Sequence, residues 1–264
     1  MNTPTRTLSA IYPVRLRTDL TRDAAYAYWA GPHAEIAGRL PNLMEYNQYH
    51  FSNTDRGYWP ATTTVGTLIP PCAPLDGLSE VRLPSIAAGL RTGPHMRDIY
   101  LDEQNVFEHC LGHITTLGGG RWWTKGHDDT LGHRTVLLLR RRRGVRGRIF
   151  RSFVHSRLGA ALHSVGAHDV RTYTFMPLAP VAHATLGVNH ENPSDRRYHA
   201  AVIFGTKTRA DVEGVTAAPE VASAIADQHL NCTAVHAYTV DRTVPVIRMR
   251  NREPNTGQRL ADGR

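Results

Sequence analysis

The sequence has no run of about 18 apolar residues, the length that a membrane-spanning helix requires. Its first residues, MNTPTRTLSAIYPVRLR, contain neither a continuous apolar stretch nor a small-residue cleavage site, so no signal peptide is expected. Only three cysteines occur, Cys72, Cys110 and Cys232, and none belongs to a CxxC pair. We therefore expect no disulfide framework, no membrane partner and a cytoplasmic location.

Several catalytic and cofactor-binding signatures are also missing. No GxSxG motif provides a nucleophile elbow, and neither GxGxxG nor GxxxxGK[ST] provides a phosphate-binding loop. The fifteen histidines include no HExxH motif. His109 and His113 lie four positions apart, but on the strand predicted below they stand about 13 Å apart, too far for one ion. We therefore expect neither a bound metal nor an organic cofactor.

The net charge of +8 comes mainly from arginine. One run, Arg140 to Arg143, carries part of it, and Arg146, Arg148 and Arg151 follow closely. A basic balance can indicate a nucleic-acid partner. Because no zinc-finger spacing and no aromatic RNP-like segment accompanies these arginines, we predict a solvated basic face and no nucleic acid. The alternative, a nucleic-acid binder, requires one continuous arginine face.

What the chain does contain is one order of strands and helices that occurs twice. Hydrophobic residues make up 41 % and charged residues 20 %, so a sizeable core can be buried. The apolar patterns predict β-α-β-β-α-β in each copy. The first copy has predicted strands at 8–15, 42–51, 76–82 and 109–117, and helices at 19–39 and 84–105. The second has strands at 134–142, 167–176, 197–204 and 231–240, and helices at 147–164 and 207–228.

A local match supports a duplication, since EYNQYHF at 45–51 aligns with DVRTYTF at 169–175 and places Tyr49 on Tyr173. The order of elements in each half is the ferredoxin-like order. Two such sheets packed face to face bury both faces and can enclose a cavity. The predicted fold class is therefore α+β, with two tandem ferredoxin-like halves that pair into an α+β barrel.

We predict three parts of the chain: an N-terminal half at 1–125, a C-terminal half at 126–248 and a disordered polar tail at 249–264. The linker GGGRWWTKGHDD at 118–129 joins the halves. Its three glycines predict a flexible crossing, and its tryptophan pair is expected to hold it against the body of the protein.

The first helix has two candidate caps, Asp19 and Thr21, whose side-chain oxygens can accept from exposed N–H groups. Gly31-Pro32 is expected to bend or interrupt this helix, because proline removes a donor and clashes with the preceding turn.

The segment YAYWAGPHAEIAGRLPNLMEYNQYH, residues 26–50, is the most informative stretch. A Tyr-Trp pair is followed by a histidine, and a Leu-Pro step leads into a strand that carries a tyrosine and then a histidine. These residues are Tyr28, Trp29, His33, Leu40, Pro41, Tyr46 and His50. In this pattern the sequence resembles the EthD-like family of dimeric α+β barrel proteins. The resemblance implies a cofactor-independent enzyme with a hydrophobic, oxygenated substrate, such as a polyketide-, terpenoid- or aromatic-like intermediate.

The second half keeps the order of elements but not the residues of this motif. By the alignment above, His33 falls on Arg157 and Tyr46 on Val170. This asymmetry indicates one working cavity, built mostly on the N-terminal half.

Strand alternation puts Tyr46, Gln48 and His50 on one face, and His33 on the preceding helix is expected to reach the rim of the same cavity. Imidazole can accept or donate a proton near pH 7, and a tyrosine hydroxyl can hydrogen-bond a developing oxyanion. We therefore predict His33, Tyr46 and His50 as the catalytic residues. The alternative is that His33 caps the helix and that Tyr46 only packs in the sheet.

Six further residues are predicted to bind the substrate, and two of them have a competing structural interpretation. Glu80 could serve as a base with a pKa raised by burial, but a salt bridge with an arginine is favoured. For His113 a hydrogen-bonded core histidine is the favoured interpretation. The predicted substrate-binding residues are Tyr12, Tyr28, Trp29, Gln48, Glu80 and His113.

The functional hypothesis is an enzyme of natural-product or small-molecule metabolism that catalyses dehydration, cyclisation, isomerisation or decarboxylation. His33 or His50 would remove a proton, and Tyr46 would hold an oxygen. One alternative is a cofactor-independent monooxygenase. Another is a non-catalytic accessory protein that binds a small molecule or haem. Pairing of the two halves makes a monomer sufficient, although a homodimer is also compatible with the sequence.

Overall fold

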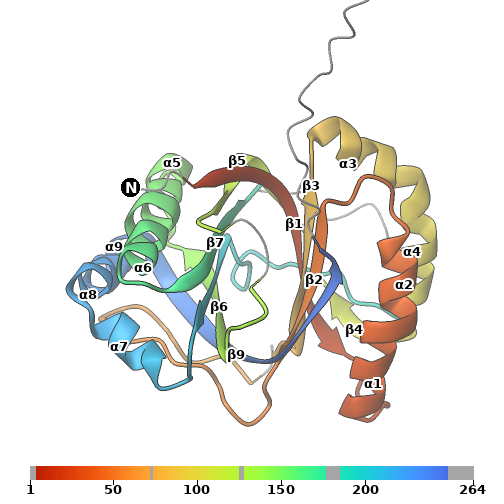
Figure 1. Ribbon diagram of the computed structural model, residues 1–264, viewed down its shortest axis with the longest axis horizontal. Coiled ribbons are helices and arrows are strands. Elements are labelled where there is room, and N and C mark those ends of the chain that lie inside the picture. Colours follow the sequence, from red (N-terminus) through yellow and green to blue (C-terminus); the bar gives the residue numbers. More distant parts are fainter. Residues whose placement is uncertain (1–3, 72–73, 125–127, 177–184, 249–264) are drawn as a thin grey trace, which may run out of the picture.

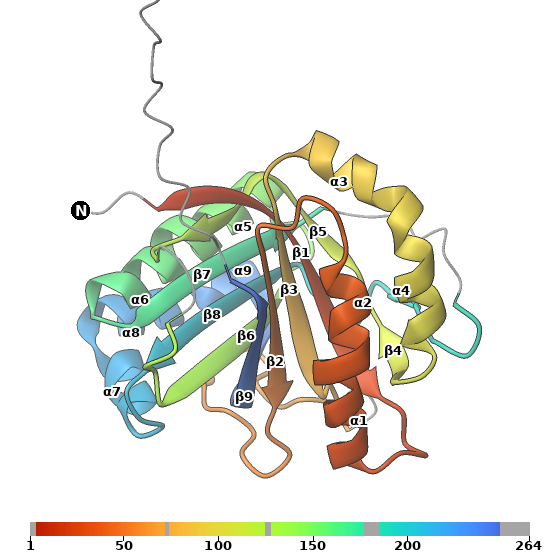
Figure 2. The same ribbon diagram turned by 45° about the vertical axis from the view of Figure 1, so that its right-hand side comes forward.

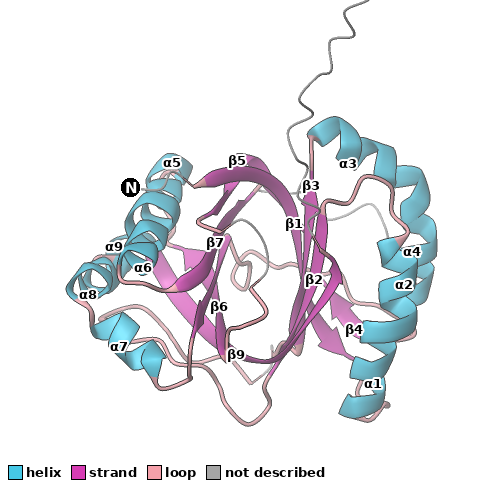
Figure 3. Cartoon of the chain, in the orientation of Figure 1, coloured by secondary structure: helices cyan, strands magenta, loops and turns pink. Residues whose placement is uncertain are grey.

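The computed structural model of the protein describes residues 4–71, 74–124, 128–176 and 185–248. Its centre is a closed barrel of eight antiparallel strands, with helices on two opposite sides (Figure 1). Colouring by secondary structure shows the strands lying between two groups of helices (Figure 3). The predicted fold class, two ferredoxin-like halves that pair into one α+β barrel, is confirmed.

The two halves have matching element orders. The N-terminal half contains β1 (Thr5–Leu16), α1 (Arg22–Tyr28), η1 (Trp29–His33), α2 (Ala34–Gly38), β2 (Glu45–Phe51), β3 (Gly77–Leu83), α3 (Ile86–Thr92), η2 (Gly93–His95), α4 (Met96–Glu103), β4 (Phe107–Cys110) and β5 (His113–Trp122). The C-terminal half contains β6 (His133–Arg141), α5 (Gly147–Ser152), η3 (Phe153–Gly159), α6 (Ala160–Ser164), β7 (His168–Phe175), β8 (Ala200–Thr206), α7 (Asp211–Ala217), α8 (Pro219–Ala226), α9 (Gln228–Asn231) and β9 (Cys232–Ile247).

Around the barrel the strands follow the order β1-β3-β2-β9-β6-β8-β7-β5, and β5 returns to β1. The short β4 pairs with the C-terminal end of β1. Two seams join the halves, β2 with β9 and β5 with β7. Each half thus contributes a four-stranded sheet, and its helices cover the outside of that sheet (Figure 2).

Three predicted element boundaries were wrong. The strand predicted at 109–117 is two strands, β4 and β5. The predicted linker starts too early, because 118–122 continues β5, whose residues 120–122 pair with β7. Gly120 allows a close strand approach, since a Cβ there would lie 2.8 Å from Thr7 Cγ2. The last strand continues past 240 to Ile247 because its extension pairs with β2. Residues 125–127 of the linker and the predicted tail at 249–264 lie outside the described residues.

The N-cap of α1 is Thr21, one of the two predicted caps, whose side chain accepts a hydrogen bond from Ala24 N at 3.3 Å. As predicted, Gly31-Pro32 interrupts the α-helix, but the chain continues through the π-helical turn η1 into α2. A π-helical turn accommodates the missing N–H of Pro32 without ending the helix.

The strands of the barrel are buried on both faces, which obscures their alternation in the sequence. In β6, Leu137 and Leu139 face the helices of the C-terminal half, whereas Val136 and Leu138 face the barrel interior. All four are fully buried. A continuous apolar run is therefore what this strand needs, since one side meets helices and the other meets the opposite sheet.

The barrel interior also holds a buried ion cluster, formed by Glu45, Glu80, Arg134, Asp169 and Arg171. Arg171 donates to Glu80 at 2.7 Å and to Glu45 at 3.0 Å across the barrel, and to Asp169 at 2.9 Å on its own strand. Arg134 donates to Asp169 at 2.6 Å. The cluster joins residues of both halves, so it favours the paired arrangement only while every charge keeps its partner.

Aromatic side chains complete the surroundings of this cluster. The Arg171 guanidinium lies 4.2 Å from the Trp122 ring centroid. Tyr49 OH donates to Glu80 at 2.7 Å, and Tyr173 OH donates to the other oxygen of Glu80. The aligned pair Tyr49 and Tyr173 therefore meets on one carboxylate. The salt bridge between Glu80 and an arginine, favoured in the sequence analysis, is present.

The arginine run divides between two sets of contacts. Arg140 lies over the Tyr198 ring, 5.0 Å from its centroid. Arg142 donates to His229 O at 2.7 Å and to Thr64 Oγ1 at 2.8 Å, and so holds the segment after β2 against the C-terminal half. No helix in the described part of the chain has the length and apolar character to span a membrane.

Replacing Arg171 tests the ion cluster. In Arg171→Met, Glu45, Glu80 and Asp169 lose their shared cation inside the barrel, so the free energy of unfolding should fall by about 3–5 kcal/mol in urea titrations. The matched control is Arg157→Met, which breaks an exposed pair with Asp227 and should cost at most about 1 kcal/mol. Equal losses in the two variants would contradict a special role of the cluster.

Buried histidines give the fold a second electrostatic property. His155 is fully buried, with Nδ1 2.7 Å from Thr172 Oγ1 and Nε2 3.2 Å from Thr174 Oγ1. Burial, with a smaller effect of nearby arginines, lowers its pKa to about 3. Burial likewise lowers the pKa of His113 and of His236 to about 4. These imidazoles are neutral in the folded protein and take up protons on unfolding as the pH falls.

Acidification should therefore destabilise the protein. A histidine with a folded pKa near 3 and an unfolded pKa of about 6.5 contributes stability above pH 6.5, which is lost as the pH falls towards 3; between pH 8 and pH 5 the loss is about 2 kcal/mol. Between pH 8 and pH 5 the free energy of unfolding of His155→Gln should fall by about 2 kcal/mol less than that of the wild type, as measured in urea titrations. The exposed His95→Gln should behave as the wild type. An unchanged pH dependence in His155→Gln would refute the assignment.

Candidate active site

A pocket lies between the outer face of the N-terminal sheet and the helices that cover it. About 70 Å³ inside it is open to the centres of water molecules. We call it the helix-side pocket. Its apolar lining residues are Ala10, Val14, Ala37, Leu40, Leu43, Val81, Leu83, Met96, Ile99 and Phe107, and the others are Tyr12, His33, Tyr46, Ser79, Thr92, Glu103 and Cys110. An apolar wall with a few ionisable groups is typical of a small-molecule site.

The interrupted first helix brings His33 to this pocket. His33 is the last residue of the π-helical turn η1, whose first residue, Trp29, packs on the start of β3. There the chain has Gly77, and a Cβ at that position would lie 2.6 Å from the Trp29 ring. The close approach fixes the turn against the sheet. π-Helical turns occur frequently at functional sites.

His33 forms a buried hydrogen-bonded pair with Asp102 of α4. Nδ1 of His33 lies 2.8 Å from Oδ2 of Asp102, and Tyr28 and Asn105 donate to Oδ1 at 2.6 and 3.0 Å. Burial raises the pKa of Asp102, but these hydrogen bonds outweigh it and lower the pKa overall. The ionised carboxylate accepts the Nδ1 proton, which makes Nε2 the proton acceptor. No described residue hydrogen-bonds Nε2.

Glu103 follows Asp102 on α4, and its side chain lines the pocket. Cys110 Sγ donates to one of its oxygens at 3.5 Å, and Thr185 Oγ1 donates to the other at 3.4 Å. Burial raises the pKa of Glu103 to about 7. At neutral pH this carboxyl group can therefore both release and take up a proton.

Tyr12 and Tyr46 add two phenols to the pocket. The Tyr46 hydroxyl accepts a hydrogen bond from Gln48 Nε2 at 2.9 Å, and the same amide donates to Trp29 O at 2.9 Å. Burial raises the pKa of both phenols. Both therefore keep their protons at neutral pH and can donate hydrogen bonds to an oxygen of a ligand.

His50 is not among the residues that line this pocket. Its ring is stacked between Tyr26 and Trp29, at centroid distances of 4.3 and 4.6 Å, and its Nε2 lies 3.3 Å from Gln48 Oε1. Burial lowers the pKa of His50 to about 3. The alternation of β2 is as predicted, but His50 lies further along the strand, under the first helix.

The other predicted binding residues have different surroundings. Tyr28 does not line the pocket, and its hydroxyl donates to Asp102, the partner of His33. Trp29 is not in the lining either and stacks on His50 at a centroid distance of 4.6 Å. Glu80 points into the barrel, where it belongs to the ion cluster. His113 is buried and stacks on Phe175 at 4.5 Å. Of the predicted site residues, the structure brings together Tyr12, His33 and Tyr46 in one pocket, with Gln48 behind Tyr46.

Asp102 and Glu103 were not among the residues predicted from the sequence. Their only signal was an adjacent acidic pair near the end of the helix predicted at 84–105. Asp102 meets His33 across 69 positions of the chain, a contact that no local pattern indicates. Among the described residues, no group of three or more His, Cys, Asp or Glu side chains could hold a metal ion.

The C-terminal half has an ion pair in the corresponding place. Arg157, which aligns with His33, lies in the π-helical turn η3 and pairs with Asp227 at 3.0 Å. The two partners are 70 positions apart, as against 69 for His33 and Asp102. Both side chains of the arginine pair are about half exposed, whereas those of the histidine pair are buried. Only the N-terminal pair adjoins the helix-side pocket.

No family model matches the chain, and no curated protein matches it. Solved structures do match over nearly the whole length. A candidate monooxygenase from Lactobacillus acidophilus NCFM is 10 % identical with a TM-score of 0.54, and the alignment covers 94 % of this chain and 96 % of that one. A candidate monooxygenase from Fusobacterium nucleatum subsp. nucleatum ATCC 25586 is 6 % identical, with a TM-score of 0.57 and coverage of 94 % and 95 %.

An anthrone oxidase-like protein is also similar, at 6 % identity, with a TM-score of 0.55 and coverage of 92 % of this chain and 94 % of that one. At such low identities the likeness establishes the fold alone. The chain shares the α+β barrel fold of these proteins over more than nine-tenths of its length.

The His33–Asp102 pair predicts the tautomer of His33. In the wild type, ¹⁵N NMR should show His33 with a protonated Nδ1 and an unprotonated Nε2, because Asp102 accepts from Nδ1. In Asp102→Asn the amide can donate to Nδ1, so the Nε2–H tautomer should appear. Asp98→Asn, an exposed change on the same helix, serves as the control and should leave the signals in place. A wild-type Nε2–H tautomer would rule out the arrangement described above.

Proposed function

We propose that the protein is an enzyme that removes a proton from a hydrophobic, oxygenated small molecule bound in the helix-side pocket. The observation that carries this proposal is the buried His33–Asp102 pair beside an apolar cavity. A histidine whose tautomer is held by a carboxylate is suited to act as a general base near pH 7.

His33 is the proposed base. Its Nε2 takes the substrate proton while Nδ1 stays hydrogen-bonded to Asp102 at 2.8 Å. The carboxylate orients the ring and stabilises the imidazolium that forms. Tyr28 and Asn105 hold the carboxylate in turn, so the base has a supporting layer of hydrogen bonds.

Removal of a proton next to a carbonyl or phenol leaves negative charge on the substrate oxygen. Tyr46 and Tyr12 are the proposed donors to that oxygen, because burial keeps both phenols protonated. Glu103 is the proposed proton donor that completes an isomerisation or a dehydration. Its pKa of about 7 leaves part of the carboxyl groups protonated at neutral pH.

The deprotonated substrate has two fates that fit this site. It can lose water, cyclise, isomerise or decarboxylate, or it can react with dioxygen. The names of the similar structures, two candidate monooxygenases and an anthrone oxidase-like protein, favour the second fate. Both fates begin with the same proton abstraction, so the role of His33 is common to them. Membership of the EthD-like family and a homodimeric state stay predictions.

A carbon acid provides the test. We expect the wild type to accelerate deuterium exchange at the methylene of anthrone under anaerobic conditions, measured by NMR. His33→Gln should lower the catalysed rate by about 10²–10⁴-fold, because it removes the general base. His163→Gln, in the other half, is the matched control and should retain the wild-type rate.

Two outcomes would count against this function. Equal exchange rates for His33→Gln and the wild type would remove His33 as the base. Binding of anthrone without any acceleration of exchange would instead support a non-catalytic binding protein, which needs the pocket but not the base.

A further inference from the structure

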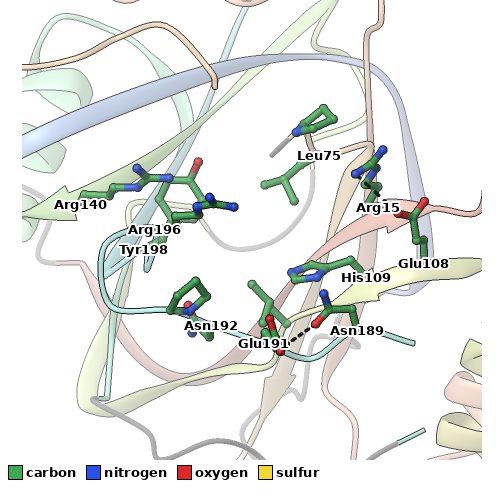
Figure 4. Close-up of a pocket in the computed structure, with 13 residues that line it drawn as sticks. Arg15, Leu75, Glu108, His109, Arg140, Asn189, Glu191, Asn192, Arg196 and Tyr198 are labelled. Carbon is green, nitrogen blue, oxygen red and sulfur yellow. Dashed lines mark hydrogen bonds and ion pairs between the residues drawn. The ribbon is translucent and has the colours of Figure 1, made fainter. Parts of the chain in front are cut away.

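A second pocket lies at one end of the barrel, and it shares no lining residue with the helix-side pocket. About 170 Å³ inside it is open to the centres of water molecules. We call it the barrel-mouth pocket. It is formed by the segment before β3, the ends of β1 and β6, the strand β4 and the segment before β8 (Figure 4).

Strand β4 is the wall between the two pockets. Phe107 and Cys110 line the helix-side pocket, whereas Glu108 and His109 line the barrel-mouth pocket. The second pocket is thus a separate site beside the first, and the proposed proton abstraction makes no use of it.

Guanidinium groups set the charge of the barrel-mouth pocket. Arg140 and Arg196 enter from one side and face Arg15 and His109 across the open space (Figure 4). Glu108 lies 3.6 Å from Arg15 and offsets its charge. Glu191 is the second carboxylate in the lining, and Arg196 Nε lies 3.8 Å from the exposed Asp195 outside it. The three lining arginines, Arg15, Arg140 and Arg196, exceed the two lining carboxylates by one positive charge.

Arg140 has hydrogen-bonding capacity to spare. Its Nη1 reaches Asp195 O only at 3.5 Å, and its buried Nε has no hydrogen-bond partner among the described residues. The guanidinium is held in place by the ring of Tyr198, 5.0 Å below it. A planar fork with unused donors matches the two oxygens of a carboxylate.

The rest of the lining is apolar enough for the body of an organic molecule. Leu75, Leu111, Pro74, Pro193 and the ring of Tyr198 all belong to the lining. An inorganic anion would leave these groups in contact with water. An organic acid would cover them while its charged end meets the arginines.

We propose that the barrel-mouth pocket binds a small carboxylic acid, with its carboxylate between Arg140 and Arg196 and its apolar body against Leu75, Leu111 and Tyr198. The site is independent of the proposed catalytic function. It gives Arg140, the first residue of the arginine run, a role in recognition that nucleic-acid binding would not require.

The first experiment compares three probes on the wild type by isothermal titration calorimetry at low salt. Benzoate has both the charge and the apolar body, benzyl alcohol has only the body and inorganic phosphate has only the charge. We expect benzoate to bind at least about tenfold more tightly than either of the others, because only benzoate uses both parts of the pocket. Equal binding of benzyl alcohol or of phosphate would overturn the proposal.

Variants then locate the site. Arg140→Gln and Arg196→Gln should each weaken benzoate binding by about tenfold, and the exposed Arg196 offers a change that leaves the buried packing intact. Arg148→Gln, on α5, is the matched control and should bind as the wild type does. If His33→Gln abolishes benzoate binding while Arg140→Gln and Arg196→Gln retain it, the acid occupies the helix-side pocket and the proposal is wrong.

Discussion

The contact between Arg171 and the two glutamates of the opposite sheet is the interaction on which the rest of the arrangement depends. It fills the barrel centre with charges that compensate one another, and aromatic side chains pack around them. A ferredoxin-like pair could have enclosed a ligand between its sheets. Here that space is occupied, and the helix-side pocket and the barrel-mouth pocket lie elsewhere, one outside the barrel wall and one at its mouth.

The two halves share one framework and differ in what they build on it. Each has a π-helical turn after its first strand, and each turn presents a residue that meets an aspartate some 70 positions later. In one half the pair is a buried histidine and aspartate beside a cavity. In the other it is a half-exposed arginine and aspartate, which is a surface ion pair of small energetic value. The framework is therefore compatible with both a chemical and a purely structural use of the same position.

The order of strands and helices could be predicted because each half repeats it and because Gly-Pro and capping signals mark the first helix. The sequence did not predict the break between β4 and β5 or the extension of β9, since both depend on pairing with distant strands. In the candidate site, alternation along β2 separated Tyr46 from Glu45 correctly, but it could not tell how far along the strand the pocket extends. His50 was therefore grouped with Tyr46, and Asp102 was missed because its partner is distant in sequence.

Among the described strands, the seam between β2 and β9 brings together the second and the last, for example Tyr46 and Ile247. A ribosome that has completed the N-terminal half has not yet produced the strand that covers the edge of β2. During synthesis that edge stays bare, and bare edges are where chains add to one another. Closure of the barrel is thus a late event of high contact order. The period of greatest aggregation risk ends when the 16-residue strand β9 has been synthesised and has paired with β2.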